Sequence, residues 1–142
     1  MKSICKIIPV FALVLLISCD FSYSGGVTLQ NELPTSVHQY IKDNQILDSD
    51  ESIVAYYDTT ISLSNEVSAM ITNKNIIYHN NGINTKISLD DIASINHTIE
   101  TFIGDIITVE SNEGNYMKIE IAPFNGGETF LQILYKKTGY LN

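Results

Sequence analysis

The fold is decided by residues 70–95, which read MITNKNIIYHNNGINTKISLDDIASI. Apolar and polar residues alternate through much of this stretch, as is typical of strands with one buried face. Asn81-Gly82 is the strongest hairpin signal in the chain, because both residue types tolerate the positive φ of a type I′ turn. Asn73-Lys74 is a second predicted turn. We therefore expect residues 75–79 to pair with a strand that holds Ile83, Thr85 and Ile87.

The period of two continues on both sides of this hairpin. Upstream, the alternating apolar residues are Ile53, Ala55, Tyr57, Ile61 and Leu63, followed in phase by Val67, Ala69 and Ile71. Downstream, residues 95–103 and 106–111 flank Gly104-Asp105, and Glu113-Gly114 turns the chain into residues 116–121. Met117, Ile119 and Ile121 should point inward from the last of these strands. The pattern predicts six or seven antiparallel strands.

Two helices are expected to flank the strands. The first covers residues 34–44, where Val37, Tyr40 and Ile41 have the spacing of one apolar helical face. Pro123 marks the end of the sheet because it cannot donate to a strand ladder. The second helix covers residues 128–137, carries Phe130 and Leu134 on one face, and stops before Gly139.

Residues 70–78, Asn81-Gly82 and residues 86–95 together resemble the bacterial PH-like domains, including the short YokE-like type. In those domains a strand that ends in a threonine turn leads to an apolar hairpin and then to an Ile-x-Leu-x-x-Ile segment, here within residues 87–92. The resemblance covers about residues 34–140. It implies a mainly β fold with two nearly orthogonal antiparallel sheets, a C-terminal helix that caps them, and a short helix before the first strand. We therefore assign residues 34–142 to a PH-like domain.

Residues 1–18 have the pattern of a secretory signal peptide. Lys2 and Lys6 form a short positive region, and residues 7–17 carry no charge. A helix of about 11 residues rises only about 16 Å, whereas a membrane-spanning helix needs about 20 residues. Cleavage of this segment is therefore expected rather than a permanent transmembrane helix.

The last four residues of this region, Leu16-Ile17-Ser18-Cys19, resemble the bacterial lipobox. The resemblance implies cleavage between Ser18 and Cys19 and acylation of Cys19, whose thiol is a strong nucleophile. Several acyl chains, palmitate among them, would then hold the protein at the membrane. We expect residues 19–33 to be the lipidated cysteine and a tether, and the domain to lie on the extracytoplasmic side, the periplasmic face in a diderm cell. The alternative is an ordinary signal peptide in which Cys19 is incidental.

Composition and charge narrow the classes of partner. The chain has 142 residues, of which 44% are hydrophobic and 17% charged, so one globular domain is expected. Its eight basic residues are all Lys and face sixteen acidic residues, for a net charge of −8. Removal of Lys2 and Lys6 with the leader leaves six Lys and a net charge of −10. Nucleic acid and anionic lipid are disfavoured as partners, because both would be repelled.

Two acidic stretches have the residue types of a chemical site. Asp48-Ser49-Asp50-Glu51-Ser52 begins like a calcium loop, but Ile53 stands where the Gly of such loops is needed. We interpret it as a solvated loop that opens the first strand. Asp90-Asp91 could suggest paired carboxylates, yet adjacent strand residues point to opposite faces, and in a turn they cap backbone N–H groups. We expect the capping role.

The three histidines are far apart in the sequence, and none has metal-ligand spacing. His97 is in phase with Ile95 and Ile99, so we expect its ring to face inward with its nitrogens hydrogen-bonded. We predict no metal, no cofactor and no catalytic residues. One of Tyr56 and Tyr57 could join an exposed protein-binding patch, while the other belongs to the core.

Phosphoinositide binding is not expected. PH domains that bind these lipids use basic residues near the loop between their first two strands, and residues 58–66 contain no Lys. The leading hypothesis is a non-enzymatic, membrane-anchored lipoprotein whose PH-like domain is a protein-binding or scaffold module in the cell envelope. A second hypothesis is an acidic inhibitor or immunity lipoprotein. A third is an envelope hydrolase that uses His97 with a nearby carboxylate.

Overall fold

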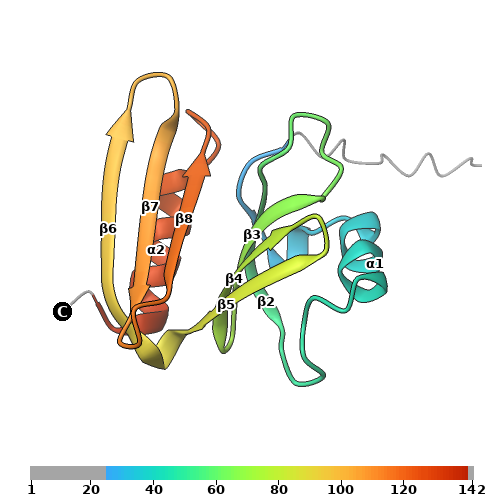
Figure 1. Ribbon diagram of the computed structural model, residues 1–142. Coiled ribbons are helices and arrows are strands. Elements are labelled where there is room, and N and C mark those ends of the chain that lie inside the picture. The colour runs from blue at the N-terminus through green and yellow to red at the C-terminus, as the bar shows by residue number, and fades with distance from the viewer. Residues whose placement is uncertain (1–24, 141–142) are drawn as a thin grey trace, which may run out of the picture.

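The computed structural model describes residues 25–140, which form two antiparallel sheets and two α-helices (Figure 1). The five strands of the first sheet, in spatial order, are β1 (Thr28–Leu29), β2 (Ile53–Asp58), β3 (Val67–Thr72), β4 (Asn75–Asn80) and β5 (Ile83–Ser88). The second sheet contains β6 (Ile92–Glu100), β7 (Gly104–Ser111) and β8 (Tyr116–Ile121). The helices are α1 (Thr35–Asp43) and α2 (Gly127–Thr138), with short 3-10 helices η1 (Gln30–Glu32) and η2 (Leu89–Asp91). The two sheets and the closing helix confirm the predicted fold class.

The central hairpin has the predicted turn. Asn81 and Gly82 adopt φ values of 47° and 87°, and Asn80 pairs with Ile83 across the turn. The turn at Asn73-Lys74 is confirmed as well, because β3 pairs with β4 from Ile71↔Ile76 onward.

The prediction that the strand pattern continues through Ile61 and Leu63 is wrong. β2 ends at Asp58, whose buried carboxylate accepts hydrogen bonds from the backbone N–H of Thr60 at 2.8 Å and of Asn65 at 2.7 Å. These two bonds fold residues 59–66 into a loop. Leu63 takes a positive φ of 52° in it, and the Ile61 side chain is fully exposed.

The turn between β6 and β7 also differs from the prediction. It consists of residues 101–103, and the N–H of Ile103 donates to the carbonyl of Glu100 at 3.2 Å. Gly104 is the first residue of β7 rather than part of the turn. It has φ 97°, and a Cβ there would lie 2.2 Å from the carbonyl oxygen of Ile121, so only glycine fits.

The folded part begins before the predicted boundary at residue 34. Thr28 and Leu29 pair with Tyr56 and Ala55 of β2, and the N–H of Val27 donates to the carbonyl of Asn125 at 2.7 Å. Residues 27–33, which we assigned to the tether, are therefore part of the domain.

Helix α1 confirms the first predicted helix and covers one face of the first sheet. Val37 and Ile41 are buried against Tyr56, Met70 and Ile77.

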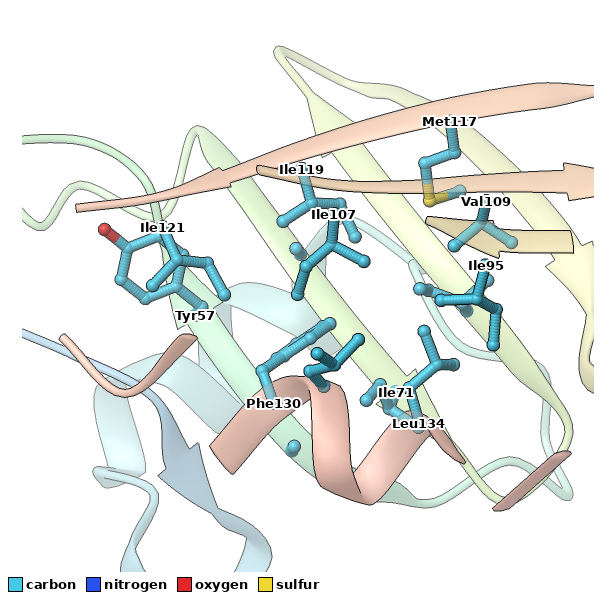
Figure 2. Close-up of a cluster of buried hydrophobic side chains, with 14 of the residues drawn as sticks. Tyr57, Ile71, Ile95, Ile107, Val109, Met117, Ile119, Ile121, Phe130 and Leu134 are labelled. Atoms are coloured by element: carbon cyan, nitrogen blue, oxygen red, sulfur yellow. The ribbon is translucent and has the colours of Figure 1, made fainter. Parts of the chain in front are cut away.

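The larger core lies between the two sheets and α2. Figure 2 shows Phe130 and Leu134 of α2 pointing from the helix toward strand residues such as Ile107 and Ile119. All four of these side chains are completely buried. The helix stops as predicted at Gly139, which adopts φ 70° and donates its N–H to the carbonyl of Tyr135.

Candidate functional site

The residues of the predicted lipidation site, Ser18 and Cys19, lie outside the described residues. Among residues 25–140, no helix is long and apolar enough to cross a membrane. In the same range, no group of three or more His, Cys, Asp or Glu side chains is arranged to hold a metal ion.

The predicted solvated loop at residues 48–52 contains a buried carboxylate instead. The Glu51 side chain has no exposed surface. Its oxygens accept hydrogen bonds from the Asp48 N–H (3.0 Å), the Thr72 hydroxyl (2.8 Å), the Asn75 amide (2.6 Å) and the Lys86 ammonium (3.1 Å). Burial raises the pKa of Glu51, but these four donors more than offset it and hold that pKa at about 2. Glu51 therefore joins the loop to β3, β4 and β5 as an ionised group.

Asp90 and Asp91 lie in the short helix η2, which makes no side-chain cap hydrogen bond. The carboxylate of Asp91 accepts from the side-chain amide of Asn112 at 3.1 Å. The capping prediction is therefore corrected: Asp91 holds the turn after β7 rather than a backbone N–H group.

His97 is paired with a carboxylate, as expected of a hydrogen-bonded ring. Its Nε2 lies 2.8 Å from Oδ1 of Asp105 on β7, and both side chains are mostly buried. The Asp105 carboxylate packs against Gly127 at the start of α2, where a Cβ would lie 2.2 Å from Oδ2. The pair thus fixes the β6–β7 hairpin against the helix. Ile99, in contrast, is exposed rather than inward-facing.

The sequence interpretation missed His79, which is completely buried. Its ring nitrogens lie 3.1 Å from the Tyr40 hydroxyl and 2.7 Å from Oδ1 of Asn84. Its burial could have been predicted from the alternation along the strand, because His79 follows the buried Ile77 by two positions on β4 and therefore points to the same face. His38, the third histidine, lines a hollow of about 430 Å³ beside α1.

Tyr56 and Tyr57 are both buried, so neither contributes to an exposed patch. They point to opposite faces of β2, and each joins a different core cluster. The exposed aromatic side chains with the largest accessible fractions are instead Phe102 and Phe124, on the turn after β6 and the segment after β8.

The surface best suited to a partner is the free edge of β6. Within residues 25–140, this nine-residue strand pairs with β7 on one side and with no strand on the other. Near its start, the Tyr140 hydroxyl donates to the carbonyl of Ala93 at 2.9 Å. Beyond that point Asn96, Thr98 and Ile99 are exposed. The strand therefore presents unpaired backbone groups together with accessible side chains.

Comparison with models of protein families identifies the family of this chain. The model of a family described as the bacterial PH domain matches residues 47–136. The chain belongs to the bacterial PH domain family. No curated protein and no solved structure matches it. The match begins before β2 and ends within α2, so it contains the whole second sheet and four of the five strands of the first sheet.

The loop between β2 and β3 of this PH domain, residues 59–66, has an acidic and apolar character. It contains Glu66 and no Lys, and Ile61 projects from it. The loop lies beside a hollow of about 270 Å³ that Gly25, Gly26 and Asn125 also line. The first described residues of the PH domain are thus next to this loop.

Proposed function

We propose that this chain is a lipid-anchored PH domain of the cell envelope that binds another envelope protein along the free edge of β6. The acyl chains on Cys19 would hold it on the extracytoplasmic side of the cell membrane. The domain acts in this proposal as a binding or scaffold module, and its partner supplies an extended segment that adds to the second sheet.

The observation that carries the proposal is how little protects the β6 edge. Natural proteins usually guard an open strand with Lys, Pro or a short length. β6 reads IASINHTIE, contains neither Lys nor Pro, and has its one carboxylate, Glu100, at the end. The other three edge strands differ: β1 has only two residues, β5 carries Lys86, and β8 carries the exposed ion pair of Lys118 with Glu120.

The edge strand is also held to the rest of the domain by side-chain contacts. The hydrogen bond between His97 and Asp105 joins β6 to β7, and Asp105 rests against Gly127 of α2. A strand that is already ordered loses less conformational entropy on binding than a flexible segment would. Backbone hydrogen bonds would provide affinity, and the side chains of Asn96 and Thr98 would contribute to selectivity.

Site-specific photo-crosslinking in cells that produce the protein tests this proposal. A photoreactive residue at position 96 or 98 should yield the same defined adduct, identified by mass spectrometry. The matched control is position 137 on the exposed face of α2, which should not yield it. Thr98→Lys adds the charge that guards natural edges, so it should lower the yield from position 96. Equal yields at positions 96 and 137, or no adduct from β6, would contradict the proposal.

A second candidate function follows from the charge. With six Lys and sixteen acidic residues after removal of the leader, the protein complements a basic enzyme or toxin. In that case the crosslinked partner is a basic enzyme, the purified protein lowers its activity, and the inhibition weakens as the salt concentration rises.

A further inference from the structure

Three loop tips with large apolar side chains lie at one end of the molecule. They belong to the β2–β3 loop, the β6–β7 turn and the segment after β8, all at the top of the view in Figure 1. Their side chains Ile61, Phe102 and Phe124 have relative exposures of 104%, 95% and 105%. Loop tips normally carry small or polar residues, so three fully exposed large apolar side chains at one end indicate an interaction surface.

The segments that carry these tips approach one another. A Cβ on Gly104, just after the β6–β7 turn, would lie 2.7 Å from the backbone nitrogen of Pro123. A hollow of about 580 Å³ is lined by Phe102 and Ile103 together with Thr59 and Ala122. Ile61 lines the adjoining hollow. We call this region, residues 59–63, 101–104 and 122–125, the apolar end.

Phe124 is the most unusual member of the apolar end. It adopts φ 68°, a conformation in which a bulky side chain is strained. Its side chain packs on nothing in the domain, since it is fully exposed. Backbone strain that no packing contact within the fold offsets is typical of residues that make contacts with another molecule.

The described chain begins at this same end. A Cβ on Gly25 would lie 3.3 Å from Cδ2 of Leu63, and Gly26 lies beside Asn125. Only six residue steps separate Cys19 from Gly25, so the two are at most about 22 Å apart whatever path the chain takes. An anchor on Cys19 would therefore keep the apolar end close to the bilayer.

We propose that the apolar end rests on the membrane surface, with Ile61, Phe102 and Phe124 inserted at the boundary between head groups and acyl chains. The inference rests on the lipid anchor of the proposed function. The anchor supplies the attachment, and the three side chains fix the orientation of the domain. Glu66 and Glu100 lie near these tips in the sequence, whereas Glu120 is paired with Lys118 beside the same hollow, so the contact suits neutral, zwitterionic head groups better than anionic ones. In this orientation β6 runs away from the bilayer and its edge stays accessible (Figure 1).

Tryptophan fluorescence tests this orientation, because the chain contains no Trp. The full-length acylated protein is reconstituted into phosphatidylcholine vesicles that contain brominated lipid, which quenches Trp within the bilayer. On these vesicles the Trp of Phe124→Trp and of Phe102→Trp should be quenched by the brominated lipid. Each should also emit at a shorter wavelength than the same Trp substitution does in the Cys19→Ser protein in detergent-free buffer. Tyr116→Trp is the matched control, because Tyr116 is an exposed aromatic residue at the opposite end of β8. It should not be quenched.

Vesicle flotation separates the two ways of failing. Protein that does not float with the vesicles overturns the anchor, and with it the proposed function. Protein that floats while the Phe124→Trp and Phe102→Trp variants are quenched no more than Tyr116→Trp overturns the inference alone. The inference is also overturned if the Trp of Phe124→Trp and of Phe102→Trp is protected from an aqueous quencher but is not quenched by the brominated lipid. A protein surface, rather than the bilayer, would then cover the apolar end.

Discussion

Replacement of Glu51 by Gln should destabilise the domain strongly at neutral pH and less at acidic pH. The carboxylate receives hydrogen bonds from four donors, two on each oxygen. A Gln side chain offers one acceptor oxygen and adds two N–H donors, so two of the four existing donors would face an N–H group. One of the two carboxylates that offset the Lys86 ammonium would also be lost, which leaves only that of Asp48 at 3.4 Å.

The size of the effect follows from the pKa of Glu51. Four donors hold that pKa at about 2, against an ordinary value of 4.5. At 1.36 kcal/mol per unit, the ionised group contributes about 3 kcal/mol to the free energy of unfolding. Because the folded-state pKa is below the unfolded one, this contribution is complete above pH 4.5 and is lost as the pH falls toward 2. At pH 3 about 2 kcal/mol of it should be gone.

Urea unfolding followed by circular dichroism measures both quantities. The gap in unfolding free energy between the wild type and Glu51→Gln should be about 3 kcal/mol at pH 7 and should shrink to about 1 kcal/mol at pH 3. Asp50→Asn is the control, since Asp50 is an exposed neighbour that pairs with Lys74 at the surface. It should leave the stability nearly unchanged. A gap that does not depend on pH would refute the assignment of Glu51 as a buried, ionised carboxylate.

Four further substitutions probe the packing and one buried hydrogen bond. Phe130→Ala should lower the free energy of unfolding by about 3–5 kcal/mol, whereas Lys136→Ala on the exposed face should change it by less than about 0.5 kcal/mol in the same urea titration. Gly127→Ala places a Cβ 2.2 Å from the Asp105 carboxylate, so thermal unfolding should show a loss of about 1–3 kcal/mol; an unchanged melting temperature would exclude the close contact. Tyr40→Phe removes the hydroxyl that is hydrogen-bonded to the buried ring of His79. It should lower the free energy of unfolding by about 1 kcal/mol, as measured by chemical denaturation.

The hairpin of β4 and β5 could be predicted because its determinants are local. Asn81-Gly82 sets the turn, and the pairing of β3 with β4 follows from the second turn at Asn73-Lys74. The helix α2 was equally predictable, since one apolar face and Gly139 define its extent. Both elements depend on neighbours in the sequence, which a single sequence displays directly.

The loop after β2 could not be predicted from periodicity. Ile61 and Leu63 keep the period of two, yet the Asp58 carboxylate accepts N–H groups from both ends of the loop and ends the strand. The same holds for Glu51, whose donors Thr72 and Asn75 come from distant strands. Partners separated by about 20 residues are set by the tertiary fold, so a run of acidic residues reads as a solvated loop until the fold is known.

The free edge of β6 and the apolar end were likewise hidden in the sequence. The pattern predicted a strand up to residue 103 and gave no reason for Phe102 and Phe124 to lie close together. Their proximity depends on the tight passage of Gly104 past Pro123. The lipid anchor stays a prediction that rests on the contiguous lipobox pattern of residues 16–19.

The mass of the N-terminal peptide, measured on protein isolated from membranes, decides whether this PH domain is attached to a membrane through Cys19. We expect a peptide that starts at Cys19 and carries a diacylglyceryl group and an amide-linked acyl chain. The Cys19→Ser protein should no longer partition into detergent or incorporate labelled palmitate. An unmodified Cys19, or a Cys19→Ser protein that still partitions with the membrane, would contradict it.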